Sequence, residues 1–267
     1  MPSSPLRSPG TAPVRARRPA LPYEESDLDR YRDLQQLAYR VAERAAAQLR
    51  AGMREGDAAE WLRQSLRAAG LGGSVRRPRA RFGRRTADGP TGGGLTGTGG
   101  RLLSLLREPE VLRDGTPYLL DGVVTAQGCT IGIALAGRFG GNPVWDVLRA
   151  DLPAYRDLVL REVRLGNPLF RIRRAVDALA ARHGYGRPDH DLPGGVIARS
   201  ALSPALSRPE HPQHLPDTRP LPPGLWAVTP RVTFRGVGVA FEELLVVTED
   251  SACWLDDDLP HVLAPAR

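Results

Sequence analysis

Apolar residues recur at helical spacing from Ser26 to about Gly52, which predicts a long amphipathic helix at the start of the folded part. A second stripe predicts a shorter helix from about Ala58 to Gly70, after a turn at residues 53–57. The stripe residues are Leu28, Tyr31, Leu34, Leu37, Ala38, Val41, Ala45 and Leu49 in the first helix, and Ala58, Trp61, Leu62, Leu66 and Ala69 in the second. The simplest interpretation is that both stripes are helix faces buried in a core.

Residues 118–141, at the centre of the chain, have the pattern of two apolar strands joined at Gln127-Gly128. One carboxylate, Asp121, lies within the first of these strands. A buried carboxylate is costly unless a metal, a cation or hydrogen-bond donors receive it. Asp121 is therefore either a site residue or a turn-former at a strand end.

The second half of the chain repeats this order of elements. Asn142-Pro143 predicts the start of a helix that is interrupted or kinked at Pro153, and a further helix is predicted from Asn167-Pro168 to Gly184. A Pro- and His-rich connection at 186–223 then leads to two strand-like runs, 225–234 and 237–247. The order helix, helix, hairpin, helix, helix, sheet predicts an α+β fold with an internally duplicated αα-ββ unit.

Two segments are not expected to form regular structure. Residues 1–25 are rich in Pro, Ser and Arg and predict a disordered tail, whereas 26–267 predict a single domain. Residues 72–100 are rich in Gly and Arg and predict a flexible loop. This loop contains G-x-G-x-x-G at 92–100, but no strand is predicted before it, so a nucleotide site is not expected there.

The charge of the chain has an unusual source. All 37 basic residues are Arg and none is Lys, as expected of a GC-rich bacterial genome, so the net charge of +7 does not by itself predict nucleic-acid binding. The absence of Lys excludes Schiff-base, pyridoxal-phosphate and P-loop chemistry that depends on a lysine.

The sequence also bears on the compartment. It contains no apolar run long enough to span a membrane and no secretory signal at its N-terminus. Its two cysteines, Cys129 and Cys253, suit neither a disulfide framework nor a zinc cluster, which favours a reducing environment. We therefore expect a cytoplasmic protein.

Five local runs share a pattern with known proteins, namely QLRAGMREGDAAEWLRQSLRAAGL, YLLDGVVTAQG, RLGNPLFRIRRAVDALAARHGY, LPPGLWAVTPRV and GVGVAFEELLVVTED. These runs resemble the pita-bread-fold family of methionine aminopeptidase, aminopeptidase P and creatinase. The resemblance covers about residues 28–258 and lacks the extra N-terminal domain of aminopeptidase P and creatinase. It implies a curved antiparallel sheet around the duplicated units.

The resemblance also implies where metal ligands should lie, because peptidases of this family hold two divalent ions with two Asp, one His and two Glu. The first Asp falls on Asp121 and the last Glu on Glu242, but the second Asp falls on Gly132 and the first Glu on Thr229. The His is either lost, at 194–196, or displaced to His190. Two adjacent divalent ions need bridging carboxylates, so a two-metal aminopeptidase is not expected.

We expect instead a metal-independent enzyme that acts on a small polar or amino-acid-derived molecule in the old peptidase cavity, as creatinase does without metal. No cofactor is expected, and the partner is a small-molecule ligand or substrate rather than a membrane or nucleic acid. The candidate catalytic residues are Glu242, Asp121 and His190, and the candidate substrate-binding residues are Thr229, Arg231, Glu243 and Thr130, with Arg235 as an alternative to Arg231.

Other interpretations stay open. The protein could be a catalytically dead pseudo-peptidase that acts as a binding or scaffold protein, in which Asp121 and Glu242 only hydrogen-bond to Arg or backbone groups. It could also be a hydrolase with a single divalent metal ion held by Asp121, Glu242 and His190. Cys129 is either a nucleophile or, more simply, a small core residue. A homodimeric assembly is also left open.

Overall fold

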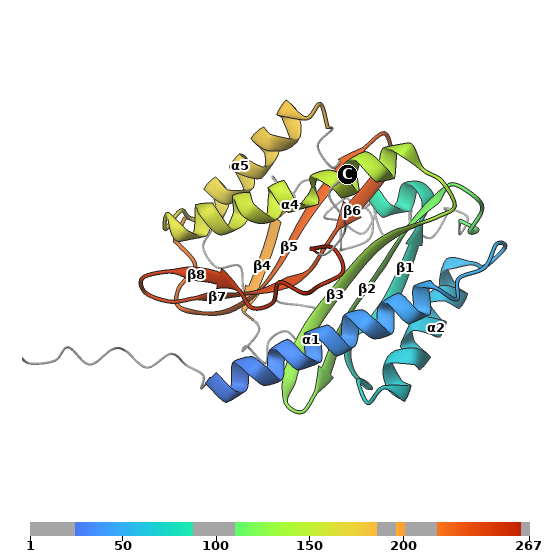
Figure 1. Ribbon diagram of the computed structural model, residues 1–267, viewed down its shortest axis with the longest axis horizontal. Coiled ribbons are helices and arrows are strands. Elements are labelled where there is room, and N and C mark those ends of the chain that lie inside the picture. The colour runs from blue at the N-terminus through green and yellow to red at the C-terminus, as the bar shows by residue number, and fades with distance from the viewer. Residues whose placement is uncertain (1–24, 88–109, 186–195, 201–217, 263–267) are drawn as a thin grey trace, which may run out of the picture.

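The computed structural model describes residues 25–87, 110–185, 196–200 and 218–262, which form two halves with two helices and an antiparallel sheet each (Figure 1). The first half contains α1 (Glu25–Ala46), α2 (Glu55–Ala68), β1 (Gly73–Phe82), the 3-10 helix η1 (Gly83–Ala87), β2 (Thr116–Ala126) and β3 (Cys129–Phe139). The second half contains α4 (Pro143–Arg164), α5 (Leu169–Arg182), β4 (Val196–Ser200), β5 (Gly224–Phe234), β6 (Val237–Ala240), β7 (Glu243–Val247) and β8 (Ala252–Trp254). The predicted α+β fold with a duplicated unit is confirmed.

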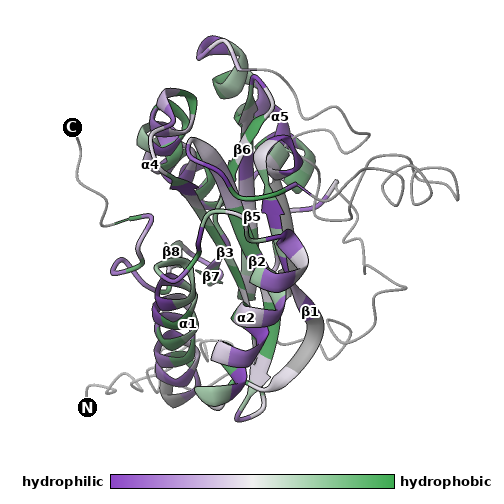
Figure 2. Ribbon diagram, turned by 90° about the vertical axis from the view of Figure 1, so that its right-hand side faces the viewer, coloured by the Kyte–Doolittle hydropathy of each residue, from purple (hydrophilic) through white to green (hydrophobic). Residues whose placement is uncertain are grey.

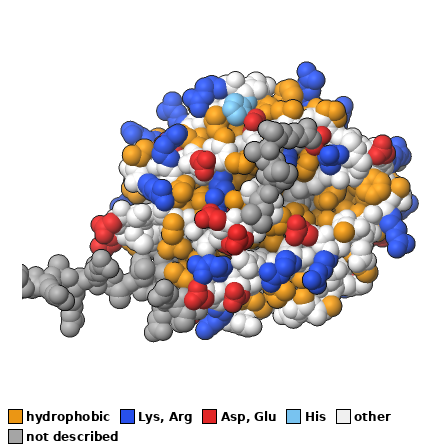
Figure 3. Space-filling model, in the orientation of Figure 1, with side chains coloured by type: hydrophobic (Ala, Val, Ile, Leu, Met, Phe, Trp, Pro, Cys, Tyr) orange, Lys and Arg blue, Asp and Glu red, His pale blue; other side chains and the backbone are white. Residues whose placement is uncertain are grey.

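The two sheets curl into a half-barrel. One has the strand order β1-β2-β3, and the other has the order β4-β5-β7-β8 with β6 paired to β5, all antiparallel. Helices α1 and α4 lie together on one side of the sheets (Figures 1 and 2). On this face, Arg side chains are interspersed with Asp and Glu (Figure 3). No helix in the described ranges is both long and apolar enough to cross a membrane.

The central hairpin is formed by β2 and β3, as the sequence predicts. Its turn is Gln127-Gly128, where both residues have positive φ values, 50° and 77°. This is the backbone that a two-residue hairpin loop with the right-handed strand twist requires. Asp121 pairs with Ala134, so Gly132, two residues away from Ala134, lies on the same face as Asp121. Asp121 is in mid-strand, so its interpretation as a turn-former is wrong.

The predicted flexible loop at 72–100 is wrong in its first part, because residues 73–82 form β1 and 83–87 form η1. Ala80 and Phe82 are buried, and the residues that alternate with them, Arg79 and Arg81, point to the other face. An arginine-rich stretch forms a strand here because those two arginines meet a carboxylate on β2. Residues 88–100 lie outside the described part of the chain.

Three details of the second half also differ from the prediction. Helix α4 is continuous through Pro153, with buried residues on both sides of the proline, so the predicted interruption is wrong and only the alternative of a kink remains. The predicted strand 237–247 is divided at residues 241–242 into β6 and β7. The predicted connection 186–223 contains β4, which pairs with β5.

Two apolar cores stabilise the fold. One is formed by α1, α2 and the β1–β3 sheet together with residues of β5 and β7, and so it joins the two halves; the other is formed by α4, α5 and the second sheet. The C-terminal segment crosses from the second half to the first, because Leu255 and Leu259 pack into the core beneath α1. The predicted tail, residues 1–25, lies outside the described range except for Glu25.

Candidate functional site

Asp121 is held between two arginines of β1. Its Oδ1 lies 3.0 Å from Nε of Arg79, and its Oδ2 accepts a hydrogen bond from Nη2 of Arg81. The Asp121 residue is 4% exposed, and the Arg81 side chain is 8% exposed. Register explains this clamp, because Arg79 pairs directly with Asp121 across β1 and β2 and Arg81 follows two residues later on the same face. The carboxylate is thus neutralised by guanidinium groups.

Glu242 approaches the same face from the other half of the molecule. It lies in the break between β6 and β7 and is 4% exposed. A Cβ atom built on Gly132 would overlap the Glu242 carboxylate, so this carboxylate lies directly against the glycine backbone. Any larger residue at 132 would force Glu242 to move. The structure therefore brings Asp121 and Glu242 to one face of the half-barrel, as the resemblance implies. Gly132 of β3 lies on this face next to Glu242.

Tyr39 of α1 joins the two halves behind Glu242. Its hydroxyl lies 2.8 Å from the Glu242 carbonyl oxygen and 3.3 Å from that of Ala134, and it accepts from the amide of Glu242 at 3.2 Å. Burial raises the pKa of this phenol far above its usual value, so the group stays protonated and can donate. One side chain thus supplies hydrogen bonds that the diverging strands cannot make to each other.

Replacing Tyr39 by phenylalanine should lower the free energy of unfolding by about 1–3 kcal/mol, because buried backbone groups of Glu242 and Ala134 lose their partner. Urea denaturation of the purified variant measures this. Tyr155→Phe is the matched control, since Tyr155 is equally buried and its hydroxyl has no hydrogen-bond partner among the described residues. If the free energy of unfolding fell equally in the two variants, the contact between the two halves would not depend on the Tyr39 hydroxyl.

Glu243 points away from Glu242, as expected of the adjacent position on a strand. It is 1% exposed, and both of its oxygens lie 2.9 Å from Nε of Arg156 on α4. Nε2 of His261 contacts the same carboxylate, and the His261 ring stacks on Phe241 with centroids 4.7 Å apart. The structure therefore places Glu243, a predicted substrate-binding residue, in a buried ionic network on the helical side of the sheet.

The remaining predicted residues are spread more widely. Thr229 is partly exposed and pairs with Ile197 of β4, while Arg231 is 7% exposed and donates to the Thr86 carbonyl oxygen of η1. Thr229 and Arg231 alternate on β5 and so share a face. Thr130 lies on the same face as Gly132, nearer the hairpin turn, with its hydroxyl 3.2 Å from that of Thr125.

Two alternatives raised by the sequence are placed away from Asp121. Cys129 is 3% exposed, packs in the core that contains α1, and has its thiol pKa raised by burial, which fits the interpretation as a core residue. Arg235 is exposed in the turn between β5 and β6, with its guanidinium over the Phe234 ring. His190 and Gly194–Gly195 lie outside the described residues.

The donors at this place do not fit a pair of divalent ions. Such ions need bridging carboxylates, and Gly132 and Thr229 supply none, while the Asp121 carboxylate is held by Arg79 and Arg81. In the described ranges, no group of three or more His, Cys, Asp or Glu is arranged to hold a metal ion. The arrangement present is a cluster of guanidinium and carboxylate groups.

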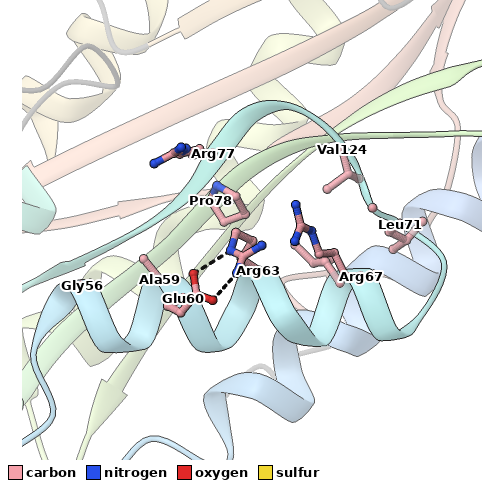
Figure 4. Close-up of a pocket in the computed structure, with 11 residues that line it drawn as sticks. Gly56, Ala59, Glu60, Arg63, Arg67, Leu71, Arg77, Pro78 and Val124 are labelled. Atoms are coloured by element: carbon pink, nitrogen blue, oxygen red, sulfur yellow. Dashed lines mark hydrogen bonds and ion pairs between the residues drawn. The ribbon is translucent and has the colours of Figure 1, made fainter.

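A hollow with a volume of about 510 Å³ lies elsewhere, between α2 and β1 (Figure 4). Arg63, Arg67 and Arg77 line it together with the apolar residues Pro78 and Val124. None of the predicted site residues contributes to its lining. It is a surface groove and is separate from the cluster formed by Asp121, Arg79, Arg81 and Glu242.

Sequence reasoning did not identify the partners of the predicted residues. The sequence predicts a loop at Arg79 and Arg81, although the alternation Arg79-Ala80-Arg81-Phe82 is the period-two pattern of a strand. Tyr39 is not among the residues of its helix that the apolar stripe predicts to be buried. Arg156 carried no signal in the sequence, because its contacts come from segments about 90–100 residues further along the chain.

Solved structures of peptidases resemble this fold. The X-Pro aminopeptidase from Thermotoga maritima superposes with a TM-score of 0.65 at 18% identity, over 92% of this chain and 63% of its own. The prolidase from Thermococcus sibiricus gives 0.62 at 13% identity (87% and 59%), and proline aminopeptidase P II from Yersinia pestis gives 0.62 at 17% identity (89% and 57%). The chain therefore spans about 57–63% of the length of these proteins.

The sequence was also compared with curated proteins and with models of protein families. None of the curated proteins matches it significantly. The model of metallopeptidase family M24 matches residues 29–249, which include every described strand except β8 and all of Asp121, Arg79, Arg81 and Glu242. This match covers most of the chain and agrees with the fold of the solved peptidases. The chain therefore belongs to metallopeptidase family M24.

Proposed function

We propose that the protein uses the cavity of the M24 fold to bind a small carboxylate-bearing molecule, without the dinuclear metal chemistry of a peptidase. The observation that carries this proposal is the clamp on Asp121, whose carboxylate is neutralised by Arg79 and Arg81. Two guanidinium groups face one carboxylate in this clamp, and the resulting net positive charge favours an anionic ligand.

Metal analysis and peptidase assays test the first part of this proposal. After incubation with Mn²⁺, Co²⁺ or Zn²⁺ and removal of free metal, we expect no stoichiometric metal by mass spectrometry and no hydrolysis of X-Pro peptides. Two equivalents of metal with peptidase activity would refute the proposal. One equivalent, lost on replacing Glu242 by glutamine, would instead establish a one-metal hydrolase in which His190 is the candidate third ligand.

Ligand binding tests the second part. A screen of small mono- and dicarboxylates by thermal shift should yield at least one that stabilises the protein. Its affinity should fall about tenfold in Arg79→Gln, because Arg79 is the more exposed of the two clamp arginines and a charge-assisted hydrogen bond is worth about 1.5–3 kcal/mol. Arg67→Gln on α2 is the control. Equal affinity in both variants would place the ligand outside the cavity.

A metal-independent enzyme is the second candidate, and the position of Glu242 favours it. Its carboxylate is buried and lies directly against the Gly132 backbone, on the same face of the half-barrel as Asp121. A carboxylate placed in this way is suited to act as a general base. Replacing Glu242 by glutamine separates the two candidates, since an enzyme would lose turnover of the bound molecule whereas a binding protein would keep its affinity. Both candidates suit a reducing compartment such as the cytoplasm.

A further inference from the structure

The hollow between α2 and β1 is shaped by an irregularity in β1 (Figure 4). The pairing of β1 with β2 shifts between Arg76 and Arg79, so residues 77 and 78 have no partner in the ladder. Pro78 suits this position because it has no N–H to leave unpaired. Gly122 of β2 lets it pack closely, since a Cβ on Gly122 would lie 3.3 Å from the Pro78 Cα. The irregularity places two consecutive residues, Arg77 and Pro78, in the lining of one hollow, whereas a regular strand would point them to opposite faces.

The charged residues in this lining are mostly basic. They are Arg63 and Arg67 of α2, Arg77 of β1 and a single carboxylate, Glu60. Glu60 neutralises Arg63, because its two oxygens accept from Nε of Arg63, at 2.6 Å, and from Nη2. Arg67 and Arg77 are exposed, and within the described residues their side chains form neither an ion pair nor a hydrogen bond. The hollow therefore has an unpaired guanidinium group on each of its two walls.

The apolar residues of the lining offer a ligand little surface. Leu66, Leu71 and Val124 are at most 2% exposed, so a ligand meets mainly the arginine side chains. Figure 4 shows Arg63 and Arg67 rising from α2 toward β1, with Arg77 on the β1 side. Guanidinium groups present paired N–H donors that match the oxygens of a phosphate group. The accessible chemistry of the hollow is therefore that of an anion site.

We propose that this hollow binds a small phosphate monoester, such as a sugar phosphate or a mononucleotide. The phosphate of such a molecule carries a charge of about −1.5 to −2 at pH 7, which matches the two unpaired guanidinium groups of Arg67 and Arg77. The hollow has a volume of about 510 Å³, within the range of small-molecule sites, about 300–1,000 Å³, and so has room for the organic part of the ester as well. The site shares no lining residue with the cluster of Asp121, and the proposal is independent of the function assigned to that cavity.

The first measurement is binding to the full-length protein. A panel of phosphate monoesters that includes glucose 6-phosphate, ribose 5-phosphate and AMP is screened by thermal shift at low ionic strength, and the affinities of the compounds that bind are measured by calorimetry. We expect at least one monoester to bind about tenfold or more tightly than its unphosphorylated counterpart. Added salt should weaken this binding by screening the arginines. If no monoester binds, or if the unphosphorylated compound binds equally well, the proposal is wrong.

Variants place the ligand in the hollow. Arg67→Gln and Arg77→Gln should each weaken binding of the monoester about tenfold. Glu60→Gln should have the opposite effect, because it releases Arg63 from its ion pair and removes a carboxylate that repels the phosphate; we expect binding about threefold tighter. Arg171→Gln on α5 is the matched control, since it makes the same change of charge at an exposed position outside the hollow. Its affinity should equal that of the unaltered protein.

Three results would overturn the assignment. If Arg171→Gln weakened binding as much as Arg67→Gln, the monoester would be held only by the overall positive charge of the protein. Loss of binding in Arg79→Gln but not in Arg67→Gln would move the ligand to the Asp121 cavity. A single-stranded RNA that bound far more tightly than the monoester, with the same losses in Arg67→Gln and Arg77→Gln, would make the groove a surface for a polyanion instead.

Discussion

Replacing Asp121 by alanine is expected to lower the free energy of unfolding by about 3–5 kcal/mol. This is the usual effect of removing one partner of a buried ion pair, because the other charge stays behind without compensation. Here that charge is mainly the Arg81 guanidinium, since Arg81 is the more deeply buried of the two arginines. Chemical denaturation followed by circular dichroism measures the loss.

The same position offers an internal control. If the loss comes from the stranded arginine, adding Arg81→Met to Asp121→Ala should recover much of it, because a buried ion pair can often be replaced by apolar residues at little cost. Asp146→Asn, which removes a more exposed pair with Arg138, should cost less than about 1 kcal/mol. The loss at Asp121 should also be equal in EDTA and in Mn²⁺. A loss seen only with Mn²⁺ present would identify Asp121 as a metal ligand instead.

The second large effect is expected at Arg156, for which we predict a loss of about 3–5 kcal/mol on replacement by methionine. Its guanidinium contacts both oxygens of Glu243, donates to the Asp256 carbonyl oxygen at 2.9 Å and lies over the Trp254 ring. The variant leaves Glu243 buried with His261 alone. It also removes an anchor of the C-terminal segment, so hydrogen exchange at residues 255–262 should increase.

A nearby position provides the comparison. Asp257 also bonds to Arg156, at 2.7 Å, but its side chain is 80% exposed. Asp257→Ala should therefore change stability by less than about 1 kcal/mol. If Arg156→Met lost no more than Asp257→Ala, the buried network would make no net contribution to stability. Unchanged hydrogen exchange at 255–262 would show that the segment is held by its apolar contacts alone.

These two clusters suggest how an M24 fold persists with an altered set of cavity carboxylates. On one face of the sheets, arginines of β1 neutralise Asp121. On the other face, the Arg156 guanidinium neutralises Glu243, and Nε2 of His261 contacts the same carboxylate. A charge buried in a low-dielectric interior is costly unless a cation or a hydrogen-bond donor compensates it. Each of these two buried carboxylates has such a neighbour. The proposed change of function therefore does not require a change of fold.

The helices, the hairpin turn at Gln127-Gly128 and the duplicated order of elements could all be predicted from the sequence. These features depend on short-range patterns, namely apolar periodicity, caps and turn residues, which act between neighbours in the chain. It also indicated that Asp121 and Glu242 would lie in one cavity, because the resemblance placed both on strands of known order. His190 remains a prediction, since it lies outside the described residues.

The contacts of those carboxylates depend on the tertiary structure. The pairing of Arg79 with Asp121 depends on the register of β1 against β2, and the contact of Glu242 with Gly132 depends on how the two halves close on each other. Such contacts join residues 40 to more than 100 positions apart, and a local pattern carries no information about which distant charge a buried side chain will meet.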